Sequence, residues 1–217
     1  MTSQDTGTGN VTHVLSYMTL RKAVGIIAIA LPLVLIAGKW LLEGPGLPRS
    51  ISAYYYTGMR DVMVGSLCAI AVFLLSYKGY DQRDDVAGDV ACVFALGVAL
   101  FPTVPDGGHT PTQGIVSVVH SLSAGGFFLT LAYFSLVLFR KGSAFPTPRK
   151  RLRNHIYAVC GWVILLCALG LGLVHLLPAS SPVLAWSPTF WIEAAGIWAF
   201  GWSWFTKGEG ILQDEEV

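Results

Sequence analysis

Long runs of apolar residues alternate with short polar connections along almost the whole chain. A window of about 19 residues, which suits a bilayer crossing, identifies such runs. There are six of them, near residues 23–42, 61–77, 86–104, 115–139, 155–177 and 189–206. The connections contain proline, glycine and charged residues, as loops between neighbouring helices do. The pattern predicts an all-α integral membrane bundle in which residues 23–206 form one domain of six transmembrane helices.

The segment before the first run has a pattern of its own. One helical face is marked by apolar residues at spacings i, i+3, i+4 and i+7, namely Val11, Val14, Leu15 and Met18. Arg21 and Lys22 follow, where a membrane surface would lie. Residues 1–22 are therefore expected to be a polar N-terminus and a short interfacial amphipathic helix that lies flat before the first span.

Positive charge is distributed unevenly between the predicted loops. If the N-terminus is cytoplasmic, the cytoplasmic side holds eleven of the 14 Lys and Arg residues, and the other side holds only Lys39, Arg49 and Arg60. The positive-inside rule then places both termini in the cytoplasm, with residues 207–217 as an acidic tail. The expected location is a plasma membrane or a bacterial inner membrane.

Composition agrees with a membrane protein and narrows its partners. Hydrophobic residues make up 53% of the chain and charged residues 12%, whereas soluble domains carry roughly 25% charged residues. The net charge of +1 gives no basic excess, so no nucleic-acid partner is expected. Cysteines occur only inside apolar runs, without a C-x-x-C pair, and are read as inert core residues: Cys68, Cys92, Cys160 and Cys167.

Ionisable residues within or beside the predicted spans gather on the outward side. An ionisable group within a span is costly and is by default a candidate for function. His120 and Glu193 lie inside apolar runs, and their alternative is structural pairing across the bundle. Asp61 opens the second run, where it could simply cap a helix. His175 ends the fifth run, where it could simply sit among lipid headgroups.

The connection between the first two runs is the densest polar motif. It contains three adjacent tyrosines at 54–56, which suit a membrane interface, and two arginines, Arg49 and Arg60. Paired arginines could hold a phosphate or carboxylate headgroup. We therefore expect an outward-facing polar pocket, with these ligand-binding candidates: Arg49, Ser52, Arg60, Asp61, His120, His175 and Glu193.

Small residues suggest how two of these helices meet. In the fourth run they recur every four positions, at Ser117, Ser121 and Gly125. A comparable strip in the sixth run is formed by Ala195, Gly196 and Ala199. Small residues at this spacing allow close helix approach in lipid, and such a contact would bring His120 near Glu193.

Short motifs along the chain carry a resemblance to a known family. Ser50-Ile51-Ser52 precedes the second run, Phe101-Pro102 ends the third, His120 opens a small-residue stretch that leads into Phe127-Phe128, and Glu193 lies early in the sixth. Together these motifs resemble the six-helix DRAM and fibroblast-growth-factor-receptor-activating membrane family and similar bacterial six-helix proteins. The resemblance covers most of the chain and implies the handling of membrane lipid, with Ser52, His120 and Glu193 as the positions to watch. The tyrosine run and the paired arginines depart from that family.

Two functions remain open at this point. The favoured one is the binding or handling of membrane lipid without chemistry of its own, and the basic run 149–153 would also attract anionic headgroups on the cytoplasmic side. The alternative resembles the ceramidase and adiponectin-receptor membrane hydrolases, which act on lipid amides or esters. Their Zn²⁺ would here be held by His120, His175 and either Asp61 or Glu193. The His-x-x-x-His of their last helix and a seventh helix are both missing. Whether any reaction is catalysed is left open.

Overall fold

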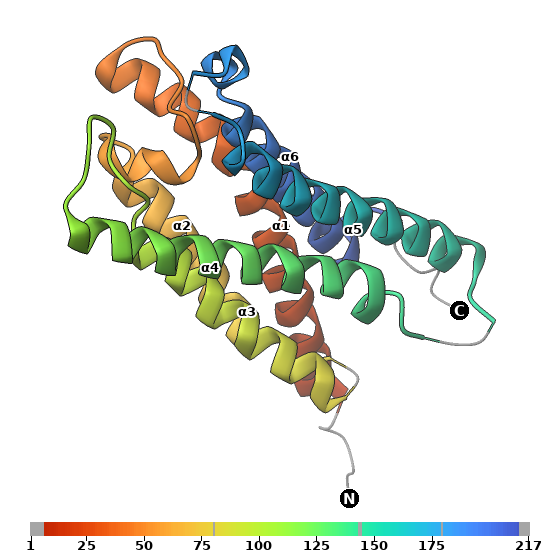
Figure 1. The fold of residues 1–217 in the computed structure, drawn as a ribbon. Coiled ribbons are helices and arrows are strands. Elements are labelled where there is room, and N and C mark those ends of the chain that lie inside the picture. The colour runs from red at the N-terminus through yellow and green to blue at the C-terminus, as the bar shows by residue number, and fades with distance from the viewer. Residues whose placement is uncertain (1–6, 80, 143–144, 179, 213–217) are drawn as a thin grey trace, which may run out of the picture.

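The computed structural model describes the backbone of residues 7–79, 81–142, 145–178 and 180–212, and side chains within these ranges from Tyr17 onward. All regular structure in these ranges is helical (Figure 1). The long helices are α1 (Gly7–Glu43), α2 (Arg60–Leu75), α3 (Gln82–Leu100), α4 (Pro111–Tyr133), α5 (Pro148–His175) and α6 (Pro188–Lys207). Short elements are the 3-10 turns η1 (Ser52–Tyr56) and η3 (Pro182–Trp186), and a π turn, η2 (Phe134–Leu138), that continues α4. For the residues in these ranges, the prediction of an all-α fold with six helices is confirmed.

Polar caps begin three of the helices one to two turns before their apolar runs. Asp81 caps α3 by accepting a hydrogen bond from the Arg83 amide. Thr110 caps α4 and Thr147 caps α5, each with proline as the first helical residue. A capping side chain satisfies amides that have no partner within the helix, so polar residues belong at these positions. The apolar runs alone therefore place the start of each helix too late.

The first helix differs from the expectation. α1 runs without a break from Gly7 to Glu43, so the separate interfacial helix expected within residues 1–22 is the first part of α1. No glycine or proline falls between Asn10 and Val24 to end a helix there, and Arg21 and Lys22 both favour helix. The side chains before Tyr17 lie outside the described residues.

Within the described part of the chain, three helical stretches are long and apolar enough to cross a membrane: Tyr17–Glu43, Pro111–Leu138 and Pro148–His175. Large apolar side chains stand exposed on them, such as Leu41 at 86%, Leu122 at 70% and Leu166 at 64%. Apolar surface of this kind is typical of contact with lipid. α2 is shorter, because its 16 residues rise only about 24 Å against a hydrocarbon core of about 30 Å.

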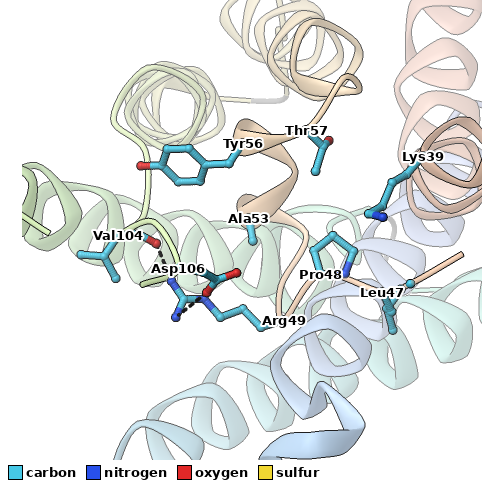
Figure 2. A pocket seen from close by; sticks show the side chains of 10 residues that line it. Lys39, Leu47, Pro48, Arg49, Ala53, Tyr56, Thr57, Val104 and Asp106 are labelled. Atoms are coloured by element: carbon cyan, nitrogen blue, oxygen red, sulfur yellow. Dashed lines mark hydrogen bonds and ion pairs between the residues drawn. The ribbon is translucent and has the colours of Figure 1, made fainter. Parts of the chain in front are cut away.

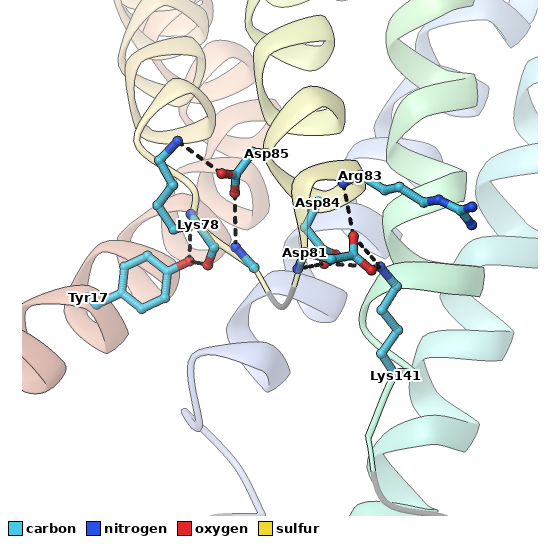
Figure 3. Close-up of polar contacts among 8 residues, drawn as sticks. Tyr17, Lys78, Asp81, Arg83, Asp84, Asp85 and Lys141 are labelled. Carbon is cyan, nitrogen blue, oxygen red and sulfur yellow. Dashed lines mark hydrogen bonds and ion pairs between the residues drawn. The ribbon is translucent and has the colours of Figure 1, made fainter.

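The contacts of the loops between helices show that these loops lie at two opposite ends of the bundle. At one end, which we call the terminal end, the Tyr17 hydroxyl accepts from the Lys78 amide at 2.8 Å and also bonds the Lys78 carbonyl (Figure 3). Lys141 reaches the same region and bonds Asp81 at 3.1 Å and the buried Asp84 at 3.0 Å. These ion pairs tie the α2–α3 connection to the segment after α4.

The opposite end, which we call the loop end, holds the connections after α1, α3 and α5. The chain before η1 is attached to α6 there, because the Phe190 amide donates to the Arg49 carbonyl at 3.0 Å. Tyr54 and Phe190 pack together in a buried apolar cluster beneath this junction. A second buried cluster, which includes Tyr77, Phe134 and Trp204, fills the bundle towards the terminal end.

Candidate functional site

A cavity of about 620 Å³ lies at the loop end, between α4, α5, α6 and the chain before η1. We call it the α4–α5 cavity. Its lining mixes polar side chains, five of them predicted from the sequence, with apolar ones. The predicted five are Arg49, Ser52, His120, His175 and Glu193. Apolar side chains in the lining include Phe128, Leu171 and Val174.

The cavity is open on its side. Ser121 and Gly125 on α4 and Gly172 and His175 on α5 all line it, and all four are exposed. Because these exposed residues belong to two helices that contact each other, we place the opening between α4 and α5. In Figure 1 these two helices, coloured green and teal, lie on the same side of the bundle.

Glu193 connects α6 to the chain before η1. Its Oε2 accepts a hydrogen bond from the Ile51 amide at 2.6 Å. The carboxylate therefore caps the start of η1, as an acidic side chain does at the positive end of a helical turn. Glu193 and Ser52 also line a smaller, mainly apolar cavity of about 40 Å³ between α1, α2, α4 and α6. They thus lie at the boundary between the α4–α5 cavity and the core of the bundle.

His120 is held in one orientation at the end of α3. Its side chain is buried, and its Nδ1 lies 2.7 Å from the Phe101 carbonyl oxygen. A carbonyl only accepts, so Nδ1 carries the proton and the neutral imidazole keeps its lone pair on Nε2. That nitrogen can accept a hydrogen bond or a proton from a bound molecule.

His175 adopts the corresponding tautomer at the other edge of the cavity. Its Nδ1 lies 2.8 Å from the Leu171 carbonyl oxygen one turn earlier in α5. In its neutral form this ring also presents an unprotonated Nε2. Unlike His120, the side chain of His175 is exposed, which places it at the rim of the cavity.

Arg49 is fixed by the loop between α3 and α4 (Figure 2). Its Nη1 lies 3.2 Å from Oδ1 of Asp106, and its Nη2 donates to the Val104 carbonyl. Arg49 also lines a neighbouring cavity of about 240 Å³ together with Lys39 and Tyr56. A half-exposed guanidinium between two cavities can bind an anionic group from either side.

Arg60 and Asp61 do not line the α4–α5 cavity. The Arg60 guanidinium lies 4.3 Å from the ring centroid of Tyr55 and donates to its hydroxyl at 2.9 Å. Asp61 is exposed in the first turn of α2, a position where the helix dipole stabilises a carboxylate. The two arginines thus have different partners, and the structure does not bring them together around one headgroup.

His120 and Glu193 share the cavity but form no hydrogen bond or ion pair with each other in the described part of the chain. Each is bonded to a backbone group instead. The expected small-residue contact is also different, because Gly125 on α4 has open space at its Cβ position. α4 contacts α6 through the Phe128 ring, which packs against Gly196. A Cβ atom added to Gly196 would stand only 2.3 Å from this ring.

The described residues do not assemble a metal site. No group of three or more His, Cys, Asp or Glu side chains among them is placed to hold a metal ion. Of the four zinc ligands considered for the hydrolase alternative, Asp61 lies outside the cavity, and Glu193 is bonded to the Ile51 amide. We therefore derive no metal-assisted step from this site.

Sequence reasoning missed two residues that shape the cavity. Gly172 on α5 has open space at its Cβ position, and Thr189 opens α6 beside Arg49 and Glu193. The only signal for Gly172 was the local Gly170-Leu171-Gly172 pattern in an otherwise bulky apolar run.

Comparison with known proteins adds no relative: no family model, no curated protein and no solved structure matches the chain.

Proposed function

We propose that this protein is a multi-pass membrane protein that binds membrane lipid in the α4–α5 cavity. In this arrangement all six helices cross the bilayer of a plasma membrane or bacterial inner membrane, and both termini are cytoplasmic. The loop end then faces outward. The observation that carries the proposal is a cavity with charged and polar groups that opens sideways between two apolar helices.

The chemistry of the cavity suits an amphiphile. Arg49 and His175 offer a cation and an imidazole to a headgroup, whereas Phe128 and Leu171 offer apolar surface to an acyl chain. Leu122 and Leu173, which follow the opening residues Ser121 and Gly172 in the chain, are exposed. A lipid could therefore enter from the bilayer while its chain stays among apolar groups. The resemblance to the DRAM family, which implies lipid handling, points in the same direction.

Filling the cavity tests the proposal. Gly125 and Gly172 both have open space at their Cβ positions, so Gly125→Leu and Gly172→Leu add bulk at the opening without a clash at Cβ. Gly65→Leu is the matched control, because Gly65 has equally open space but lies on α2, outside the cavity. Native mass spectrometry of protein purified in mild detergent should show lipid retained by the parent and by Gly65→Leu, and lost from the two cavity variants. Equal retention in all four proteins would overturn the proposal.

The headgroup contacts are tested separately. Arg49→Ala should weaken retention of an anionic lipid such as phosphatidylglycerol by about tenfold, the effect of losing one charge-assisted hydrogen bond, and His175→Ala, which removes an acceptor without charge, should weaken it less. Arg60→Ala is the control, since this arginine lies outside the cavity. An equal loss in Arg60→Ala would argue against a headgroup site at Arg49.

The topology is tested by introducing one cysteine at a time and labelling it with a membrane-impermeant thiol reagent. Cysteine at Gly46 and Gly107 should be labelled in intact cells, and cysteine at Asn10 and Ser143 should be labelled only after the membrane is permeabilised. The parent chain, with its four natural cysteines, supplies the background. Labelling at Ser143 with protection at Gly107 would overturn the orientation.

A further inference from the structure

A second charged cavity lies at the terminal end of the bundle. Its volume is about 300 Å³, and it lies between α1, α5, α6 and the connection that leads into α5. We call it the basic cavity. Four cationic side chains line it, namely Arg21, Lys150, Arg153 and Lys207. Among the described residues of this lining, Glu209 is the one carboxylate.

Three of these cations are buried. Arg21 is 9% exposed, Arg153 6% and Lys207 8%. Glu209 lies 3.8 Å from Arg153, and the charge of Lys207 is repelled by Arg21, Lys150 and Arg153 and attracted by the carboxylate of Asp84. Burying like charges together costs free energy unless an opposite charge offsets it. Among the described residues, the four cations of the lining thus have two carboxylates near them, Glu209 and Asp84, and an anion would reduce the positive charge that remains.

Arg21 is positioned to meet such an anion. Its guanidinium lies 4.1 Å from the Tyr17 ring centroid, and Nη1 contacts the Met18 sulfur at 3.8 Å. Its Nε is buried and has no hydrogen-bond acceptor among the described residues. A buried donor without an acceptor is costly, so an oxygen-rich ligand in the cavity would gain this hydrogen bond.

The basic run 149–153 divides according to this cavity. Lys150 and Arg153 turn towards it, and Lys150 Nζ donates to the Phe139 carbonyl at 3.0 Å. Arg151 is exposed and does not line the cavity. This short run thus contains two cations that line the basic cavity, Lys150 and Arg153, and one exposed cation outside it, Arg151.

We propose that the basic cavity is a binding site for a phosphate group, carried either by an anionic lipid headgroup or by a free phosphorylated compound. Arginine binds phosphate oxygens through its planar fork of N–H groups, and lysine adds a mobile point charge. The site is independent of the lipid proposed for the α4–α5 cavity. Lys150 and His175, which line the two cavities, are separated by about 37 Å of helical rise along α5.

The test uses the full chain in detergent micelles and three probes: pyrophosphate, dioleoyl phosphatidic acid and dioleoyl phosphatidylcholine. Titration calorimetry measures pyrophosphate binding, and native mass spectrometry measures lipid retention. Lys150→Gln should weaken binding of the phosphate probe about tenfold, as expected for one lost charge-assisted contact, and Arg21→Gln should do the same. Arg151→Gln, which changes the same run outside the cavity, should stay within about twofold of the parent.

The probes separate the two sources of phosphate. Retention of phosphatidic acid over phosphatidylcholine, without pyrophosphate binding, identifies a lipid headgroup, and pyrophosphate binding alone identifies a free compound. Binding of neither, or an equal loss in Arg151→Gln and Lys150→Gln, would overturn the proposal. If Arg21→Gln fails to fold, the partly exposed Lys150 still carries the comparison. Gly172→Leu should leave phosphate binding in the basic cavity unchanged. The two proposals can therefore fail independently: the one for the basic cavity and the one for lipid in the α4–α5 cavity.

Discussion

Gly25 on α1 lies directly against Gly201 on α6, such that a Cβ on Gly25 would stand 2.8 Å from the Gly201 carbonyl oxygen. The Phe205 amide nitrogen would be equally close, at 2.7 Å. Backbone atoms of a packed helix cannot move aside as a flexible side chain can. Glycine at these positions therefore allows the two helices to approach closely, as small residues do in membrane bundles.

Gly25→Ala should destabilise the protein by roughly 1–3 kcal/mol, the usual cost of overpacking. Thermal unfolding in detergent measures the effect. Gly65→Ala is the matched control, because its added methyl group meets open space and glycine disfavours a helix interior. Similar melting temperatures for the two variants would show that α1 and α6 can separate at little cost.

Glu193→Ala should loosen the chain around η1. The variant removes the acceptor of the Ile51 amide, a bond to a charged group worth about 1.5–3 kcal/mol. Hydrogen exchange at residues 50–57 should become faster, whereas exchange in α5 should stay unchanged. Glu193→Gln keeps an oxygen acceptor and should recover most of the protection. Unaltered exchange at 50–57 in Glu193→Ala would mean that other contacts hold this segment.

His120→Ala should lower stability by roughly 1–3 kcal/mol, because it removes a buried side chain and leaves the part-buried Phe101 carbonyl without its donor. His109→Ala is the control, since His109 is exposed in the loop between α3 and α4. Thermal unfolding of both variants decides the matter. Equal stability would contradict a structural hydrogen bond at His120.

The ion pair between Lys141 and Asp81 should give a pH-dependent contribution to stability. The hydrogen bond from Lys141 holds the pKa of Asp81 below its ordinary value of 3.8. A lowered folded-state pKa stabilises the fold above the unfolded pKa, and this contribution is lost as pH falls through the folded value. Lys141→Ala should therefore melt below the parent at about pH 6, and the gap should narrow towards about pH 3.

Arg140→Ala is the control for this prediction. Arg140 precedes Lys141 in the chain, but its guanidinium bonds the Leu136 carbonyl one turn earlier. Its effect on melting should be the same at both pH values. A gap for Lys141→Ala that stays constant from about pH 6 to about pH 3 would rule out the assigned role of Asp81.

The sequence predicted the helices well because each apolar run is long compared with the connections. It placed the start of α3 at residue 86, whereas the helix begins at Gln82. Asp84 and Asp85 lie within the first turn, where the helix dipole stabilises carboxylates. A prediction from hydropathy alone assigns the same two residues to the loop. The boundary therefore depended on capping chemistry and not on apolar character.

The candidate site was predictable where an ionisable residue interrupts an apolar run, as at His120 and Glu193. It was not predictable where membership of the site depends on the direction in which a side chain points. Arg49 and Arg60 are separated by η1, a 3-10 turn without an apolar period, and that turn sends Arg49 to the cavity and Arg60 to Tyr55. The spacing that contains Gly125 was equally ambiguous, because small residues serve both a helix contact and an open cavity.

The shortness of α2 has a consequence for the lipid around the protein. Val72 and Leu75 are more than half exposed on this helix, yet its rise of about 24 Å falls about 6 Å short of a typical hydrocarbon core. If α2 crosses the bilayer as proposed, hydrophobic mismatch would thin the membrane locally on this side, while the longer α5 tilts to fit. The energetic cost would be lowest in thin bilayers, so the length of a single helix would bias the membrane in which the protein accumulates.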